Sequence, residues 1–520
     1  MHSIRIKNMR SLIDTQDIQI KPLTFLLGSN SSGKSTFLRT FPLLRQSTEA
    51  NTVGAILWYG TYVDFGTHDD AKNRYSNNNE ISFSFSFDLN SVKRPSSVKR
   101  SINFFNTLNS RNLDDFIPGK YTFDLKLIIE CDSNGQSRTK SITITFEDHI
   151  ISFDIAQSSD GISHMHDVTV NGTSIEIDTD TYRLFKAPRT LLPQLLPGQN
   201  YFSEKIIALI KKYSNKKISD DALDHTFELL KLGSSSQMLA LMKEIKDKKI
   251  WQKNVQKWDE DTPDFKELKN YLIIAGLIGI LNSSNRYLSN MAIQSRYIAP
   301  VRANVDRYYR MQDLAIDEVD FQGQNLPMYL YSLNRDKRKS LKTWAFDNFG
   351  FSPTVKRTGG HISMFIDFNN KNTVNVADLG FGFSQILPIL VQLWALTNYS
   401  NDKFRYSHIP YIITIEQPEL HLHPSMQAQL ADVFAKVTRF AFENDIDLRL
   451  IIETHSETII NRMGHLIEKQ KLDSKNINVL IFNKKYDDEY TNIDIAKFTA
   501  DGYLENWPYG FFEPDLNFNN

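Results

Sequence analysis

Residues 28–36 read GSNSSGKST, and they directly follow the apolar run LTFLL at 23–27. A strand that enters a glycine-rich turn and continues as a helix presents a ring of backbone N–H groups, and these groups and the helix dipole both attract phosphate. The spacing of the two glycines, the lysine and the serine is that of a P-loop. A plain glycine- and serine-rich turn is the alternative, but the preceding strand and the apolar face of the following helix argue against it.

Each residue type in this motif has a physical role in holding a nucleoside triphosphate. We expect the Lys34 ammonium to neutralise charge on the β- and γ-phosphates and the Ser35 hydroxyl to bind Mg²⁺, so ATP and Mg²⁺ are the predicted cofactors. The glycines permit backbone angles and a close approach that a Cβ atom would block. The predicted nucleotide-binding residues are Gly28, Asn30, Ser31, Ser32, Gly33, Lys34, Ser35 and Thr36.

The composition is that of an ordinary globular protein with no global field for nucleic acid. Of the 520 residues, 41% are hydrophobic and 23% charged, and the formal net charge is -1. Any contact with nucleic acid is therefore expected from local basic patches such as residues 93–100. The single cysteine, Cys131, excludes a disulfide framework and suits a reducing compartment. The longest apolar run, 272–281, is too short for a membrane helix, so we expect a cytoplasmic protein without membrane contact.

The periodicity of apolar residues indicates how the chain is organised. Period-2 alternation at 56–65, 80–88, 121–130 and 141–146 predicts an antiparallel β region with one solvated face. Helical spacing without a heptad repeat at 201–289 predicts a compact helical lobe rather than a coiled-coil arm. The expected units are the N-terminal half of a nucleotide-binding head at 1–70, a β-rich lobe at 71–200, a helical insertion at 201–292, the C-terminal half of the head at 293–470, and a C-terminal β-hairpin and tail at 471–520.

A second apolar strand that ends in an acid lies far along the chain. Residues 411–416 read YIITIE, so Glu416 occupies the place of a Walker B carboxylate, which helps to hold Mg²⁺. Its distance from the P-loop predicts a head assembled from both ends of the chain. A further strand, 448–452, leads to His455, at a position suited to sensing a γ-phosphate. Arginines and aromatic residues alternate at 296–310, and they either bind phosphate or join two lobes.

Several separated segments together resemble ABC-type P-loop ATPases of the SMC and OLD (overcoming lysogenisation defect) group. These segments are 28–36, 378–385, 415–424 and 453–457. Four others resemble ATPases of bacterial anti-phage defence systems, nearest to the Septu-type and retron-associated ATPases. They are 6–11, 43–47, 296–309 and 505–512.

The resemblance implies an α/β ABC-type head and a homodimer or higher homo-oligomer. Each ATP would lie between the P-loop of one subunit and the signature segment of the other. The implied signature residues are Gly380, Gly382, Ser384 and Gln385.

Two positions depart from the pattern of this group. Gly380 stands where a serine is expected, so Ser384 is only a candidate for that contact. Gln417 stands where a catalytic glutamate is expected, and an amide cannot take a proton from water. A glutamine can still orient water, so we expect slow hydrolysis. The expected catalytic residues are Glu416, Gln417, Glu419 and His455, and the expected metal residues are Ser35 and Glu416.

The resemblance implies a sensor or regulatory subunit of an anti-phage complex that controls a separate effector, such as a nuclease. OLD-type relatives carry a metal-dependent nuclease domain after the head, and the chain beyond His455 is too short for one. We therefore expect any nuclease on a partner protein. Two alternatives stay open: an ATPase that acts directly on DNA, and an assembly scaffold that binds ATP without hydrolysing it.

Overall fold

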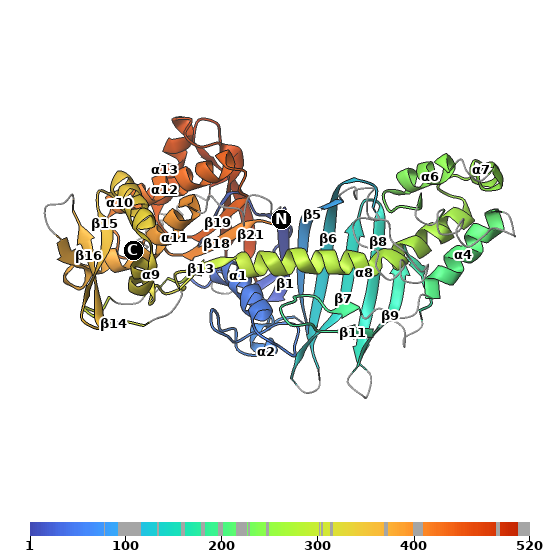
Figure 1. The fold of residues 1–520 in the computed structure, drawn as a ribbon, viewed down its shortest axis with the longest axis horizontal. Coiled ribbons are helices and arrows are strands. Elements are labelled where there is room, and N and C mark those ends of the chain that lie inside the picture. Colours follow the sequence, from blue (N-terminus) through green and yellow to red (C-terminus); the bar gives the residue numbers. More distant parts are fainter. Residues whose placement is uncertain are drawn as a thin grey trace, which may run out of the picture.

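The structure is a computed structural model, and its strands form a seven-stranded, an eleven-stranded and a four-stranded sheet (Figure 1). The predicted basic loop at 93–100 and most of the segment 505–512 lie outside the described residues. The structure describes residues 1–507 except 77, 92–115, 133–134, 158–161, 178–182, 196–200, 215–225, 227–228, 246–248, 301, 303–304, 313–315, 369–372, 399–408 and 485–488.

The seven-stranded sheet combines strands from the two ends of the chain, as predicted. Its order is β13-β18-β19-β4-β20-β21-β22, and β19 lies between the P-loop strand β4 and the Walker B strand β18. The strands from β13 to β20 pair in parallel, whereas β21 and β22 are antiparallel additions. The bounds are β4 Leu23–Gly28, β13 Arg296–Ile298, β18 Tyr411–Glu416, β19 Leu448–Glu453, β20 Ile477–Asn483, β21 Asn492–Phe498 and β22 Leu504–Glu505.

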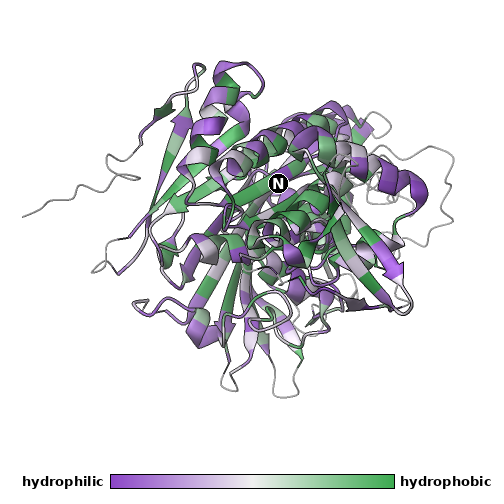
Figure 2. Ribbon diagram, turned by 90° about the vertical axis from the view of Figure 1, so that its left-hand side faces the viewer, coloured by the Kyte–Doolittle hydropathy of each residue, from purple (hydrophilic) through white to green (hydrophobic). Residues whose placement is uncertain are grey.

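Helices cover both faces of this sheet, which explains why its parallel strands are apolar throughout. Leu23 and Phe25 of β4 pack into the core formed with α11, α12 and α13, whereas Leu26 packs into the core on the side of α1. Figure 2 shows hydrophobic ribbon gathered at the centre of the molecule and hydrophilic segments mainly toward its outside. The bounds are α1 Lys34–Glu49, α11 Phe381–Asn398, α12 Pro424–Glu443 and α13 Glu457–Glu468.

The eleven-stranded sheet is antiparallel, and it includes β1 to β3 from the N-terminus. Alternation correctly predicted strands at 80–88, 121–130 and 141–146. The bounds are β1 Ser3–Met9, β2 Leu12–Asp14, β3 Ile18–Gln19, β5 Glu80–Ser91, β6 Gly119–Cys131, β7 Ser137–Phe146, β8 His149–Gln157, β9 Ser163–Val170, β10 Thr173–Ser174, β11 Arg183–Phe185 and β12 Gln194–Leu195.

The strand expected at 56–65 is wrong. This segment forms one isolated bridge, Tyr59 to Asp64, and then leads to the short helix α2, His68–Ala71. The Gln46 side chain of α1 donates to the Leu57 carbonyl at 2.7 Å and accepts from the Val63 N–H at 3.1 Å. An amide side chain thus pairs backbone groups that a neighbouring strand would otherwise pair, so the alternating apolar residues are buried without a sheet.

One long helix, α8 (Pro263–Gln294), connects the parts of the molecule. It has 32 residues and runs from the end formed by α4, α6 and α7, across the antiparallel sheet, to α1 and β18 (Figure 1). The apolar run 272–281 is buried in it, as expected for a core helix. No helix of the described residues is long and apolar enough to cross a membrane. The neighbouring helices are α4 Tyr201–Tyr213, α6 Ser235–Glu244 and α7 Lys249–Val255.

The four-stranded sheet and two helices precede the signature segment. They pack into the same core as α11 and α12. The bounds are β14 Tyr309–Arg310, α9 Leu326–Ser332, α10 Arg335–Phe349, β15 Ser352–Thr358, β16 His361–Asp367 and β17 Thr373–Asn375.

Candidate functional site

The turn between β4 and α1 has the shape that a phosphate-binding loop requires. Gly28 and Gly33 have φ values of 149° and 96°, a region that favours glycine. A Cβ atom at Gly28 would lie 2.3 Å from the Phe482 carbonyl oxygen, and one at Gly33 would lie 2.6 Å from Ser11 Oγ. A side chain at Gly28 would therefore collide with the backbone of β20, whereas one at Gly33 would displace the Ser11 side chain and strain the local backbone.

The polar groups of this loop are arranged to receive an anion. Lys34 is buried, and its Nζ donates to the carbonyls of Gly28 at 3.0 Å and Ser29 at 2.7 Å. Burial lowers the pKa of Lys34, because a charged ammonium loses hydration there. Ser32 Oγ is buried without a hydrogen-bond partner among the described residues. A buried cation, an unpaired hydroxyl and glycines that cannot carry a Cβ atom fit a phosphate group.

The other predicted P-loop residues lie where the motif places them. Asn30 and Ser31 are exposed at the tip of the loop, and Ser31 has a φ of 62°. Ser35 and Thr36 lie in the first turn of α1, with Ser35 half-buried and Thr36 buried. The loop is also held from the C-terminal end of the chain, because Thr491 Oγ1 donates to the Ser32 carbonyl at 2.8 Å.

Two acids end neighbouring strands beside the P-loop, and Glu416 is the one that the sequence predicted. Arg39 of α1 forms a two-point ion pair with it, with Nε to Oε1 at 2.7 Å and Nη2 to Oε2 at 2.8 Å. The Tyr297 hydroxyl donates to the same carboxylate at 2.9 Å. The Glu416 side chain is 3% exposed, so all three donors satisfy it inside the protein.

The second acid, Glu453, was missed by the sequence analysis. It ends β19 and pairs in register with Glu416. The Ser35 hydroxyl donates to Glu453 Oε2 at 2.8 Å, and Lys34 Nζ lies 4.0 Å from Oε1. Burial, and then the charge of Glu416, raise the pKa of Glu453 to about 7. The available signal was a second apolar strand ending in an acid, which is the same pattern that identified Glu416.

The remaining predicted catalytic residues follow these two strands. Gln417 has a φ of 42°, and its N–H donates to the Glu453 carbonyl at 2.8 Å. Glu419 Oε1 accepts from the backbone N–H of His455 at 2.6 Å, and burial raises the pKa of Glu419. The His455 residue itself is exposed. The structure therefore brings Glu416, Gln417, Glu419 and His455 to one edge of the sheet, with Glu419 positioning the backbone of the histidine.

Arg302 is a further buried cation that the sequence analysis did not single out. It is 1% exposed, and its Nη2 donates to the Glu416 carbonyl at 2.9 Å. Its backbone N–H donates to Oε1 of Gln385, a predicted signature residue, at 3.3 Å. Burial lowers the pKa of Arg302 to about 10, and its Nε and Nη1 have no partner within the described part of the chain. Arg302 thus joins the Walker B strand to the signature helix.

The predicted signature segment forms the beginning of α11. Gly380 has open space around it, whereas a Cβ atom at Gly382 would lie 2.9 Å from the His421 carbonyl oxygen. Ser384 Oγ donates to the Phe381 carbonyl at 2.7 Å, inside its own helix. Phe381 is 64% exposed, so this helix end is accessible on the surface of the subunit.

Two arginines of the segment 296–310 have acidic partners in this chain. Arg296 lies 2.6 Å from Glu318, and Arg307 forms an ion pair with Asp378. These pairs support the interpretation that the segment joins parts of the molecule.

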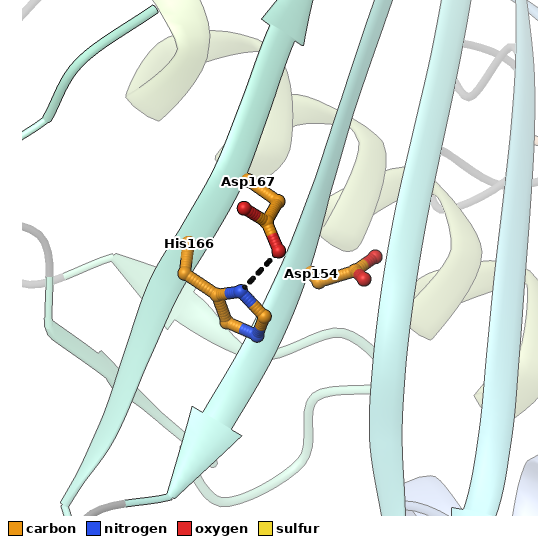
Figure 3. Close-up of side chains that lie close together, drawn as sticks. All are labelled: Asp154, His166 and Asp167. Carbon is orange, nitrogen blue, oxygen red and sulfur yellow. Dashed lines mark hydrogen bonds and ion pairs between the residues drawn. The ribbon is translucent and has the colours of Figure 1, made fainter. Parts of the chain in front are cut away.

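The groups around Ser35 fit a Mg²⁺ ion. The Ser35 hydroxyl and the Glu453 carboxylate, 2.8 Å apart, are hard oxygen donors, which this cation prefers. A different cluster lies on the antiparallel sheet, where Asp154 approaches His166 and Asp167, and the last two residues are 2.8 Å apart (Figure 3). Asp167 is 80% exposed there, and we assign no ligand to this cluster.

Solved structures with some similarity include an Smc head bound to the C-winged helix domain of ScpA, at 9% identity and a TM-score of 0.37, covering 95% of this chain and 97% of that one. The SMC head domain from Thermotoga maritima matches at 6% identity and a TM-score of 0.32, with the same coverage of 95% and 97%. No curated protein sequence matches this chain.

The family comparison is decisive for the class of protein. The family model described as an AAA ATPase domain matches residues 1–460, which include the P-loop, the signature segment, the Walker B strand and His455. The predicted mixed α/β ATPase fold is thereby confirmed. This chain belongs to the AAA ATPase domain family.

Proposed function

We propose that this protein binds ATP with Mg²⁺ at the P-loop and hydrolyses it slowly. The observation that carries the proposal is the loop itself, where Gly28 and Gly33 have no room for a Cβ atom, Lys34 is buried and Ser32 Oγ is unpaired among the described residues. When bound, Mg²⁺ neutralises phosphate charge. The sequence predicts that Ser35 and one buried acid at the end of a neighbouring strand hold it, and Glu416 is the acid that it identifies.

The residues at the carboxyl ends of β18 and β19 position the reacting groups. Glu419 fixes the backbone at His455, an exposed residue whose imidazole suits contact with a γ-phosphate. Gln417 directly follows Glu416, and its amide can orient water but cannot accept the water's proton. Hydrolysis then depends on positioning and on the charge of Lys34, so it is slow.

The test is Lys34→Ala, measured by isothermal titration calorimetry with ATP and Mg²⁺. We expect at least a tenfold loss of ATP affinity, because the cation at the phosphates is gone. Lys469→Ala is a suitable control, since the Lys469 side chain is 55% exposed and lies beyond α13. Unchanged ATP affinity in the Lys34 variant would show that the P-loop assignment is wrong.

We further propose that two subunits share each ATP. The exposed helix start at Gly380 is available to a second copy of the chain, and a helix N-terminus favours phosphate. Lys34→Ala and Gly382→Asp subunits each damage a different half of the shared site. Mixed together, they should recover part of the ATPase activity, because one composite site survives in the mixed dimer. No recovery at any mixing ratio would contradict shared sites.

The proposed role is that of a cytoplasmic sensor or regulatory subunit in an anti-phage system, with a separate effector such as a nuclease. It rests on the resemblance of segments such as 6–11 and 43–47 to ATPases of defence systems. An ATPase that acts directly on DNA and a non-hydrolysing scaffold are the alternatives. The steady-state rate of phosphate release, measured with and without DNA, separates the three roles. A slow rate that DNA does not change supports the sensor. A rate that DNA raises supports an ATPase that acts on DNA, and the absence of turnover supports the scaffold.

A further inference from the structure

The two buried carboxylates beside the P-loop have different partners. Glu416 and Glu453 lie at paired positions on β18 and β19, so both reach the same edge of the sheet. Their side chains are 3% and 4% exposed. Water therefore cannot compensate either negative charge, and the protein groups around each acid decide what else it can bind.

Glu416 already accepts three hydrogen bonds from donors of this chain. The Arg39 guanidinium contacts both carboxylate oxygens, at 2.7 and 2.8 Å, and the Tyr297 hydroxyl adds a bond of 2.9 Å to Oε1. A fork of two charge-assisted hydrogen bonds is among the strongest and most directional contacts of a carboxylate. Arg39 thus neutralises the charge of Glu416, which is the carboxylate that the sequence predicts as a metal ligand.

Glu453 has no such partner. The Ser35 hydroxyl donates to it at 2.8 Å, and the nearest cation is Lys34 Nζ at 4.0 Å. A carboxylate accepts several bonds, so Glu453 retains acceptor capacity for a metal ion. Of the two acids, it is the one that touches the hydroxyl expected to bind Mg²⁺.

We propose that Glu453 is the carboxylate that holds Mg²⁺ together with Ser35, while Glu416 stays paired with Arg39 and supports the site from the next strand. This inference rests on the proposed ATP-binding function. The rival explanation makes Glu453 a counter-ion for Lys34 only. The two explanations differ in whether the loss of its charge acts through the metal or directly on the nucleotide.

The experiment measures ATP affinity by calorimetry twice for each variant, in excess Mg²⁺ and in EDTA. Glu453→Gln keeps the shape of the side chain and removes its charge. We expect it to lower the Mg²⁺-dependent gain in ATP affinity at least tenfold and to leave the affinity in EDTA within about twofold of the wild type. Glu416→Gln is expected to retain most of the gain. Glu443→Gln, an exposed acid at the end of α12, is the matched control and should change neither value.

A second readout and a second variant keep the test independent of folding. Electron paramagnetic resonance of Mn²⁺ with ATP reports metal binding directly, and it should weaken in Glu453→Gln. Glu453→Asp keeps the charge on a shorter side chain, so it should restore part of the Mg²⁺-dependent gain. Circular dichroism and the melting temperature show whether each variant is folded.

Three outcomes would overturn the inference. If Glu453→Gln keeps the full Mg²⁺-dependent gain in ATP affinity and Glu416→Gln loses it, then Glu416 is the metal ligand, as the sequence predicts. An equal change of affinity in Mg²⁺ and in EDTA would identify Glu453 as a counter-ion for Lys34. If the wild-type protein binds no ATP in either buffer, the proposed ATP-binding function is wrong as well. This result is distinct from the other two.

Discussion

Charged residues are buried at the carboxyl edge of the parallel sheet, whereas those of the antiparallel sheet are in contact with solvent. At the carboxyl edge of the parallel sheet, Lys34, Arg302, Glu416 and Glu453 are each at most 3% exposed. Among the described residues of the eleven-stranded sheet, no Asp, Glu, Lys or Arg is buried. Its ion pairs, such as Lys140 with Glu80 at 2.6 Å, lie in contact with solvent.

This difference indicates where the chemistry is located. Exposed ion pairs contribute only about 0–1 kcal/mol each, so the antiparallel sheet depends on its apolar face for stability. Burying a charge is costly unless the charge is paired, and Arg302 and Glu453 are incompletely paired within the described chain. Such groups are typical of functional sites, where a ligand completes their contacts.

The largest expected effect on activity is that of Gln417→Glu, at the carboxyl edge of the parallel sheet. A carboxylate there can act as a general base, so turnover should rise by about 10² to 10⁴. Steady-state phosphate release measures the rate. Gln470→Glu is a matched control, because Gln470 is exposed and has a similar backbone, with φ 56° against 42° for Gln417.

A wild-type rate that is already many turnovers per second would contradict this prediction. The base would then be another acid, and Glu419 is the nearest candidate in the sequence. With the expected slow rate, the protein stays long in its ATP-bound form. That behaviour suits a switch rather than a motor, and faster turnover in Gln417→Glu should weaken control of a partner effector.

The sequence predicted correctly those elements whose residue types and apolar periodicity both indicate the same structure. The P-loop was identifiable because strand, glycine spacing and helix are all local features of 23–49. The antiparallel strands β5, β6 and β7 followed from alternation, since each has one apolar face. The head was expected to combine both ends of the chain, and β4 does lie between β19 and β20.

What the sequence did not predict depends on contacts between distant segments. Residues 56–65 alternate like a strand, but Gln46 of α1 pairs their backbone groups instead. The pairing of Arg39 with Glu416 joins residues far apart in the chain, and only the fold shows that Glu453 meets Ser35. The division into five units and the roles of the site residues stay predictions.

The smallest expected effect on nucleotide binding comes from Phe87→Ala in the antiparallel sheet. Phe87 is 0% exposed and stacks on Tyr287 of α8, with ring centroids 4.6 Å apart and an angle of 12°. Loss of a buried phenylalanine usually costs about 3–5 kcal/mol of stability through lost burial and a cavity. The melting temperature should therefore fall clearly, whereas Phe442→Ala, at a residue 79% exposed, should leave it almost unchanged.

ATP affinity in the folded Phe87→Ala protein should stay within about twofold of the wild type, because the P-loop, β18 and β19 belong to the other sheet. Calorimetry below the melting temperature of the variant measures this. One structural route between the two regions is α8, which contacts both α1 and the antiparallel sheet. A loss of ATP affinity as large as that expected for Lys34→Ala would mean that strain passes from the antiparallel sheet into α1, and the two sheets would then form one functional unit.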